Sequence, residues 1–203
     1  MRRQQVAEAL KAELDEQVVI ASLGSAGRAW REFGGDNATF YSSDPMGAAP
    51  GIALGAALAR PDLEFVLLEG DGDLTMNLGS LLAIAGSVAT NLKMVVFANH
   101  RYETGGGQPL AGAERLDLAG IAAAAGWGWT RTLDFDTPES ELRATLREMC
   151  DVEGPAIVVA RVVTEASPYG GPGDHSGAEA QFVFREQIRQ LDLKTRSLKE
   201  GIA

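Results

Sequence analysis

Residues 66–77 read "VLLEGDGDLTMN", in which an apolar run meets two aspartates around one glycine and then continues with helix-forming residues. Gly70 and Gly72 let the backbone turn sharply and approach a ligand closely. A helix beginning near Leu74 would aim its unpaired N–H groups and the positive end of its dipole at the same place. The stretch alone fits a turn with an aspartate cap, an acidic surface loop, or a metal and phosphate site.

The surrounding sequence alternates apolar strands with helices. β-rich runs occur at residues 18–23, 39–43, 64–70, 93–99 and 155–163, with a weaker one at 128–133. Apolar residues at helical spacing predict helices at the N-terminus and at 47–60, 74–89, 115–125, 138–150 and 178–199. Strands that are apolar throughout belong to sheets covered on both faces. The predicted fold class is therefore α/β, a doubly wound and mostly parallel sheet with helices on both faces, forming a single domain over residues 1–203.

The composition of the chain argues against several classes of function. The 203 residues carry a net charge of −10 and a pI near 4.7, which argues against a nucleic-acid groove or an anionic membrane surface. Cys150 is the only cysteine, so no intrachain disulfide is possible and its role is expected to be structural. The N-terminus lacks the apolar core of a signal peptide, and the apolar runs are strand-length. We therefore expect a cytoplasmic protein without nucleic-acid or membrane partners.

Two polar side chains end consecutive predicted strands. Asp71 follows the strand at 64–70 and Asn99 ends the strand at 93–99, so they are 99 − 71 = 28 residues apart, about one βαβ unit. Ligands of doubly wound sheets sit beyond the carboxyl ends of the strands. If the strands are neighbours, about 4.8 Å apart, both side chains would reach one cation. A carboxylate and an amide oxygen suit Mg²⁺ better than zinc, and a diphosphate could bridge this metal and the following helix.

Three segments carry a resemblance to a known family. GDG at residues 70–72, with Asn99 at the end of the next strand, resembles the thiamine-diphosphate motif. "SSDPMGAAPGIALGAALARPD" (42–62) is similar to the segment that precedes this motif in 2-oxoacid decarboxylases. "NHRYETGGGQP" (99–109) is similar to a loop of phosphonopyruvate and sulfopyruvate decarboxylases. The chain thus resembles the diphosphate-binding domain of these enzymes, and its length resembles that of the β subunits of sulfopyruvate decarboxylases.

The resemblance implies a cofactor site. Asp71 and Asn99 would bind Mg²⁺ through their side chains and Arg101 through its backbone carbonyl, with diphosphate oxygens and a water completing the coordination shell. Met46 matches the apolar residue that supports the bent cofactor, and the carbonyl of Asp44 would accept a hydrogen bond from its aminopyrimidine. The remaining cofactor-binding residues that the resemblance implies are Gly70, Gly72, Asp73 and Tyr102.

The sequence also departs from the family pattern. Asp73 stands where Ser or Ala is usual, Asp44 replaces a small residue, and Gly105 stands where Thr is common. The simplest structural interpretation of Asp73 is a helix cap. The resembling enzymes need a pyrimidine-binding domain whose glutamate activates the cofactor, and this chain is long enough only for the diphosphate-binding domain. The resemblance therefore implies a separate pyrimidine-binding subunit in a heterotetramer or larger assembly.

The implied activity is decarboxylation of a small anionic 2-oxoacid, similar to sulfopyruvate or phosphonopyruvate, to an aldehyde and CO₂. Within this chain, His100 and Glu103 are the candidate catalytic side chains, because they lie beside the metal ligands and in the glycine-rich loop. Glu69 is expected to form a salt bridge at its strand end, whereas core or interface packing is expected for Trp127, Trp129 and Met76. Two alternatives stay open: a carboligase subunit of the acetolactate-synthase type, and a non-catalytic module that holds thiamine diphosphate or a nucleotide.

Overall fold

Six strands form one parallel sheet in the computed structural model, which describes residues 1–43, 45–165 and 177–200. In spatial order the strands are β2 (Thr39–Tyr41), β1 (Val18–Ala21), β3 (Phe65–Gly70), β4 (Leu92–Ala98), β8 (Ala156–Arg161) and β7 (Trp129–Leu133). Every neighbouring pair runs parallel. The predicted α/β fold class is confirmed, and each of the six predicted strands is present.

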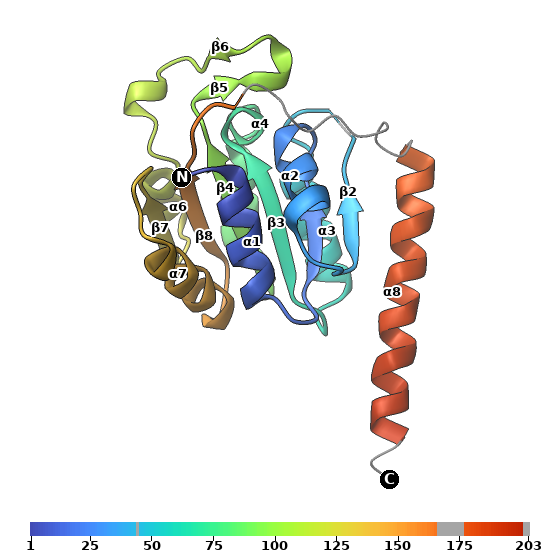
Figure 1. The fold of residues 1–203 in the computed structure, drawn as a ribbon. Coiled ribbons are helices and arrows are strands. Elements are labelled where there is room, and N and C mark those ends of the chain that lie inside the picture. Colours follow the sequence, from blue (N-terminus) through green and yellow to red (C-terminus); the bar gives the residue numbers. More distant parts are fainter. Residues whose placement is uncertain (44, 166–176, 201–203) are drawn as a thin grey trace.

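Helices cover both faces of this sheet and enclose two apolar cores (Figure 1). One face is covered by α1 (Arg3–Glu13), α2 (Ser25–Phe33) and α7 (Glu139–Asp151). The other is covered by α3 (Ala49–Ala59), α5 (Gly79–Ala85), α6 (Leu118–Ala125) and α8 (Gly177–Glu200). Alternate strand residues feed the two cores, since Val19 and Ala21 pack on the first face whereas Val18 and Ile20 pack on the second.

Helix α8 lies along β2, at the edge of the sheet (Figure 1). The Phe184 ring meets the edge of the Phe40 ring with the centroids 5.5 Å apart, and the side-chain oxygen of Gln187 accepts a hydrogen bond from the Thr39 amide at 3.0 Å. Because an edge strand exposes unpaired N–H groups, this helix protects the edge from other strands. No helix in the described part of the chain is long and apolar enough to cross a membrane.

Three elements differ from the predicted pattern. Helix α2 was not predicted, and the helix predicted over 74–89 is divided into α4 (Asp71–Thr75) and α5. The break falls where the Asn77 side chain donates a hydrogen bond to the carbonyl of Gly47 at 2.9 Å, so the loop before α3 packs against it. After β4 the chain forms a small hairpin of β5 (Arg101–Tyr102) and β6 (Gln108–Pro109), with short 3₁₀ helices at Glu103–Gly105 and Ala113–Arg115.

Residues assigned to packing mostly fulfil that role. Trp127 is buried and its indole N–H donates to the carbonyl of Leu81 at 2.9 Å, whereas the partly exposed Trp129 donates to Glu148. Burial raises the pKa of the Cys150 thiol to about 11, so the thiol stays protonated and unreactive at neutral pH. Met76, by contrast, is 53% exposed.

The strand order reverses between β1 and β3. From β1 the chain crosses one face through α2 to reach β2, and from β2 it crosses the other face through α3 to reach β3. The two crossovers leave a crevice beyond the carboxyl ends of β1 and β3, which is where ligands bind in sheets of this kind.

Candidate functional site

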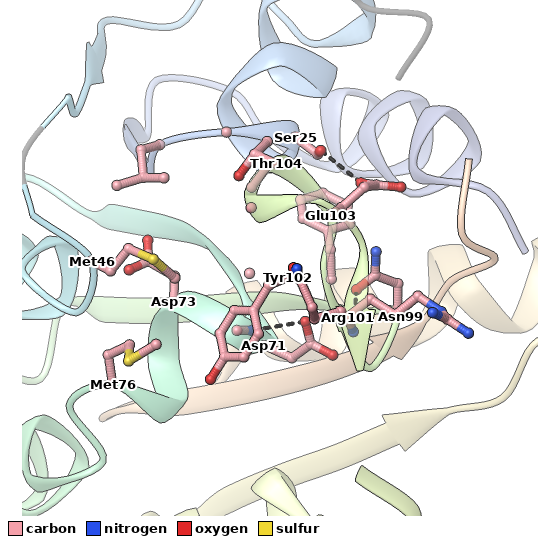
Figure 2. Close-up of a pocket in the computed structure, with 18 of the residues that line it drawn as sticks. Ser25, Met46, Asp71, Asp73, Met76, Asn99, Arg101, Tyr102, Glu103 and Thr104 are labelled. Carbon is pink, nitrogen blue, oxygen red and sulfur yellow. Dashed lines mark hydrogen bonds between the residues drawn. The ribbon is translucent and has the colours of Figure 1, made fainter. Parts of the chain in front are cut away.

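A cavity of about 580 Å³ occupies this crevice (Figure 2). Its walls come from the segments that follow β1, β3 and β4, together with α1 and the loop before α3. The lining residues are Arg3, Leu23, Gly24, Ser25, Ala26, Met46, Gly70, Asp71, Gly72, Asp73, Met76, Phe97, Asn99, Arg101, Tyr102, Glu103, Thr104, Gly105 and Gln108. Of the residues predicted to bind the cofactor, all but Asp44 line this cavity, and Asp44 lies outside the described residues.

Asp71 joins the ends of the two central strands. β3 and β4 are neighbours, as expected, and one carboxylate oxygen of Asp71 accepts a hydrogen bond from the His100 amide at 2.6 Å. The other accepts one from the Gly72 amide at 2.8 Å. The carboxyl is 2% exposed, and burial raises its pKa, yet no lysine or arginine of the described residues forms an ion pair with it. A buried carboxylate without a counter-ion is a plain reason to expect a bound cation.

Asn99 provides a second unsatisfied group at this place. Its side-chain oxygen accepts a hydrogen bond from the Arg101 amide at 3.0 Å, while its side-chain nitrogen is buried and has no hydrogen-bond partner among the described residues. Buried amide groups are almost always paired, so this nitrogen indicates a missing ligand atom. The oxygen keeps a second lone pair that can bind a cation, and the nitrogen can donate to an anionic ligand.

Side-chain oxygens and carbonyls here fit a hard cation. Asp71, Asn99 and the Arg101 carbonyl are one carboxylate, one amide and one backbone oxygen, which suits Mg²⁺. In the described ranges no three His, Cys, Asp or Glu side chains gather closely enough to hold a metal by themselves. The residues therefore fit a magnesium ion, and they do not form a complete protein cage.

Tyr102 packs directly against Gly72. A Cβ atom added to Gly72 would lie 2.9 Å from Cδ1 of Tyr102, so only glycine leaves room for the ring. Figure 2 shows the ring beside Asp71, inside the cavity. Gly70 is under no such restriction, since a Cβ there would meet nothing closer than 4.0 Å. The second glycine of the GDG motif is thus required by the hairpin that follows β4.

Asp73 does not cap a helix, contrary to the structural interpretation of its sequence. It lies within α4, is 6% exposed, and its carboxylate accepts a hydrogen bond from the Gly47 amide. Helix α4 already begins at Asp71 rather than near Leu74, so the carboxylate is free to join the loop before α3 to the site. Its helix-capping role is wrong because a tertiary donor takes the place of the helix N–H groups.

Glu69 also differs from its predicted role. It is completely buried and forms no ion pair with any described residue, so the expected strand-end salt bridge is wrong. One carboxylate oxygen accepts a hydrogen bond from the Gly70 amide at 2.9 Å, and the other has no partner among the described residues. Burial, reinforced by the neighbouring Asp73 carboxylate, raises the pKa of Glu69 well above its usual value, so this carboxyl tends to keep its proton.

Glu103 is bound by residues that the sequence analysis missed. One oxygen lies 2.7 Å from the Arg3 guanidinium and accepts a hydrogen bond from the Ser25 hydroxyl at 2.7 Å, and the other accepts one from the Glu165 amide at 3.1 Å. Figure 2 shows Ser25 and Glu103 joined across the cavity wall. The pairs Arg3–Glu103 and Ser25–Glu103 are 100 and 78 residues apart in the chain, and no local motif marks them.

His100 lies beside the site without pointing into the main cavity. Its backbone is left-handed, with φ 60°, and its side chain lines a separate small cavity with Asp117 and Arg161. The Arg101 guanidinium is exposed and donates to the carbonyl of Gly107 at 2.9 Å. The backbone of His100 therefore belongs to the site through its bond to Asp71, and the residue does not line the main cavity.

Comparison with known proteins agrees with this geometry. The family model described as "Thiamine pyrophosphate enzyme, C-terminal TPP binding domain" matches residues 30–160. The β subunit of sulfopyruvate decarboxylase from Methanothermobacter thermautotrophicus is 33% identical over 134 residues, which cover 66% of this chain and 71% of that subunit. Phosphonopyruvate decarboxylase from Streptomyces viridochromogenes is 31% identical over 152 residues, which cover 74% of this chain but 37% of that enzyme.

A solved structure supports the fold. The crystal structure of benzoylformate decarboxylase from Polynucleobacter necessarius superimposes with a TM-score of 0.67 at 20% identity, covering 83% of this chain and 34% of that one. This chain thus spans about a third of the single-chain relatives and most of the length of a β subunit. The family match, these relatives and the cavity beyond β1, β3 and β4 lead to one conclusion: the chain belongs to the thiamine pyrophosphate (thiamine diphosphate) enzyme family and represents its C-terminal cofactor-binding domain.

Proposed function

We propose that this chain is the thiamine-diphosphate- and Mg²⁺-binding subunit of a two-subunit decarboxylase that converts a small anionic 2-oxoacid to an aldehyde and CO₂. The names of the relatives support the reaction, since they are sulfopyruvate and phosphonopyruvate decarboxylases. The observation that carries the proposal is that the uncompensated carboxylate of Asp71 and the unpaired amide of Asn99 meet at one cavity. A cation and an anionic ligand bound together would satisfy both groups.

In this proposal Asp71, Asn99 and the Arg101 carbonyl hold Mg²⁺. The amides of His100 and Gly72 orient the Asp71 carboxylate, whose remaining lone pairs would be free to bind the metal. Because Asp71 is the single charged side chain among these three protein ligands, the diphosphate oxygens would supply most of the remaining negative charge. Thiamine diphosphate, when bound, supplies the electron sink that decarboxylation of a 2-oxoacid needs.

The catalytic glutamate is assigned to a partner. Glu103 is the single glutamate that lines the main cavity among the described residues, and its carboxylate is already held by Arg3 and Ser25. The imidazole of His100 lines another cavity. We therefore assign positioning roles to both residues, and place the group that activates the cofactor on a pyrimidine-binding subunit.

The charge of the cavity also favours a second subunit. Arg3 is shared between Glu103 and Glu165, and Asp71 and Asp73 add two further carboxyl groups to the walls. Arg101 alone adds an exposed guanidinium. A substrate with two anionic groups would need more positive charge than these described residues provide. We expect Mg²⁺ and basic side chains of the partner to supply it.

Calorimetric titration of the purified chain with thiamine diphosphate tests the site. Binding is expected in the presence of Mg²⁺ and not after its removal with EDTA, because a diphosphate cannot approach Asp71 without the cation. Asp71→Asn should weaken binding at least about tenfold, since it removes the charged ligand. The control Asp136→Asn, an exposed site outside the cavity, should leave binding unchanged. Binding that is independent of Mg²⁺, or equal in Asp71→Asn and the parent chain, would contradict the metal assignment.

Turnover tests the reaction. The chain alone should release no CO₂ from any 2-oxoacid, and the complex with its pyrimidine-binding subunit should decarboxylate sulfopyruvate or phosphonopyruvate faster than pyruvate or benzoylformate. Preference for pyruvate with formation of acetolactate would favour the carboligase alternative. Absence of turnover in a complex that binds thiamine diphosphate would favour the non-catalytic module.

A further inference from the structure

Gly47 is held at both of its backbone polar groups by side chains of a distant segment. Its amide donates a hydrogen bond to the carboxylate of Asp73, and its carbonyl accepts one from the Asn77 side chain at 2.9 Å. These two side chains follow Gly47 by 26 and 30 residues, and they lie four residues apart where α4 ends. We call this pair of hydrogen bonds the Gly47 clamp.

The backbone at Gly47 leaves no room for a side chain. Its φ of 84° lies in the left-handed region, and a Cβ atom there would lie 2.8 Å from Cβ of Asn77. The loop before α3 therefore touches the end of α4 directly. The clamp fixes the peptide units on both sides of Gly47, and Met46 contributes to the first of them.

The clamp connects two ends of the main cavity that differ in character. Asp71 and Asp73 both belong to α4, and Asp71 is one of the side chains to which we assign Mg²⁺. Met46 also lines the cavity, but its side chain is 42% exposed and has nothing charged to bind. Figure 2 shows Met46 and Asp73 on one side of the cavity and Asn99 on the other. The place of Met46 relative to the metal ligands is thus set through α4.

The carboxylate of Asp73 is suited to this contact. Gly47 is buried, so its amide needs a hydrogen-bond acceptor within the protein. Asp73 is 6% exposed and supplies that acceptor from the cavity wall. A serine oxygen would lie one bond nearer the backbone, and alanine has no acceptor at all. The residue that departs from the family pattern is therefore the one that binds the loop carrying Met46.

We propose that Asp73 is a positioning residue, which holds Met46 at the place where it contacts the ring portion of a ligand whose diphosphate is bound at Asp71. This inference rests on the function proposed above. A diphosphate and its organic rings are joined covalently, so a ligand bound at one end of the cavity presents its rings at a fixed place. A preformed Met46 meets them without an ordering cost, whereas a loop released from the clamp would have to be ordered during binding. Asp73 acts through Gly47 and needs no contact with the ligand.

Calorimetric titration with two ligands tests the proposal. Inorganic pyrophosphate with Mg²⁺ probes the metal end of the cavity alone, whereas thiamine diphosphate with Mg²⁺ probes both ends. Asp73→Ala should lower the ratio of the two affinities, thiamine diphosphate over pyrophosphate, at least about fivefold. Asp73→Asn removes the same charge but keeps an acceptor for the Gly47 amide, so its ratio should stay within about twofold of the parent value. The control Asp136→Ala, at an exposed position outside the cavity, should change neither affinity.

Hydrogen exchange of the Gly47 amide, followed by NMR, provides a measurement without any ligand. Asp73→Ala should accelerate this exchange at least about tenfold, and Asp73→Asn should restore most of the protection. Asn77→Ala releases the Gly47 carbonyl and should lower the same ratio of affinities. It replaces Asp73→Ala if that variant does not fold, which thermal unfolding of each variant verifies.

The outcomes separate this inference from the proposed function. If Asp73→Ala and Asp73→Asn both tightened pyrophosphate binding and left the ratio unchanged, the carboxylate would act by its charge on the phosphates. The positioning role would then be overturned while the proposed function stood. An equal fall of the ratio in both variants would overturn it as well, because the hydrogen bond to Gly47 would not matter. A parent chain that binds neither ligand with Mg²⁺ would refute the proposed function and the positioning role together.

Discussion

Replacing Arg3 with methionine is expected to destabilise the chain by about 3 kcal/mol. The guanidinium is 3% exposed and lies 2.7 Å from the Glu103 carboxylate, so methionine keeps most of the side-chain volume but leaves a largely buried charge without its cation. Breaking a buried pair in this way costs about 3–5 kcal/mol. The lower figure applies because the Ser25 hydroxyl and the Glu165 amide still donate to Glu103. The melting temperature should fall by about 6–12 °C.

A double-mutant cycle isolates the pair. Glu103→Gln alone should cost about 1–3 kcal/mol, because it weakens the bonds to Arg3 and Ser25 while Arg3 keeps Glu165 at 3.8 Å. In the Arg3→Met background Glu103→Gln removes a buried charge that has lost its cation. It should therefore lower the free energy of unfolding little further. The two single costs should therefore exceed the cost of the double variant by about 2 kcal/mol, which is the coupling expected for residues in direct contact.

Urea denaturation at pH 7 measures these free energies. The control is Arg147→Met, because Arg147 also lies 2.8 Å from a carboxylate, that of Glu13, but is itself 61% exposed. An exposed arginine of this kind should contribute less than about 1 kcal/mol. If Arg3→Met cost no more than Arg147→Met, or if the costs of Arg3→Met and Glu103→Gln simply added, the pair would not anchor the loop at Glu103.

Other expected outcomes follow from single contacts. Gly72→Ala should lower the free energy of unfolding by about 1–3 kcal/mol in urea titrations, because the new methyl group meets the Tyr102 ring, and Tyr102→Ala should relieve the loss. Burial raises the pKa of Glu69 above 4.5, so the native state holds a proton that the unfolded state loses. The free energy of unfolding should then fall as the pH rises from 4.5 through the native pKa, and Glu69→Gln should remove that fall. His100→Gly should stabilise the turn by about 1 kcal/mol in thermal unfolding, because φ 60° strains a residue with a Cβ, whereas His100→Val should destabilise it.

The sheet was predictable because its strands are apolar on both faces. β3 and β4 have almost no exposed residue, and such runs differ sharply from the helices and turns around them. Helix α2 was missed although its signal was present. Ala26, Ala29, Trp30 and Phe33 have the spacing of one helical face, but arginine, glycine and glutamate dilute the apolar content between two short strands. The break between α4 and α5 had no local signal, since Gly47 and Asn77 meet only in the folded chain.

The residues of the candidate site also differ in whether the sequence could place them. Asp71 and Asn99 could be placed together from sequence, because parallel pairing of adjacent strands brings their carboxyl ends to one edge. Arg3 and Ser25 could not, because their contacts with Glu103 depend on how α1 and α2 pack on the sheet. A tertiary contact also accounts for the wrong role given to Asp73, whose partner Gly47 lies in another segment, whereas the wrong role of Glu69 follows from its complete burial in the sheet.

The cavity has two walls of different character. One is complete within the chain, and the other is expected to need a partner. On one side Arg3, Ser25 and Glu103 satisfy one another, so this wall is complete within the chain. On the other, Met46 and Met76 expose apolar surface to which nothing in the described chain is bound. Changes in the first wall should therefore alter the stability and Mg²⁺-dependent ligand binding of the isolated chain. Polar changes in the second should leave the isolated chain folded, because the apolar surface there contributes free energy only after a ligand or a partner covers it.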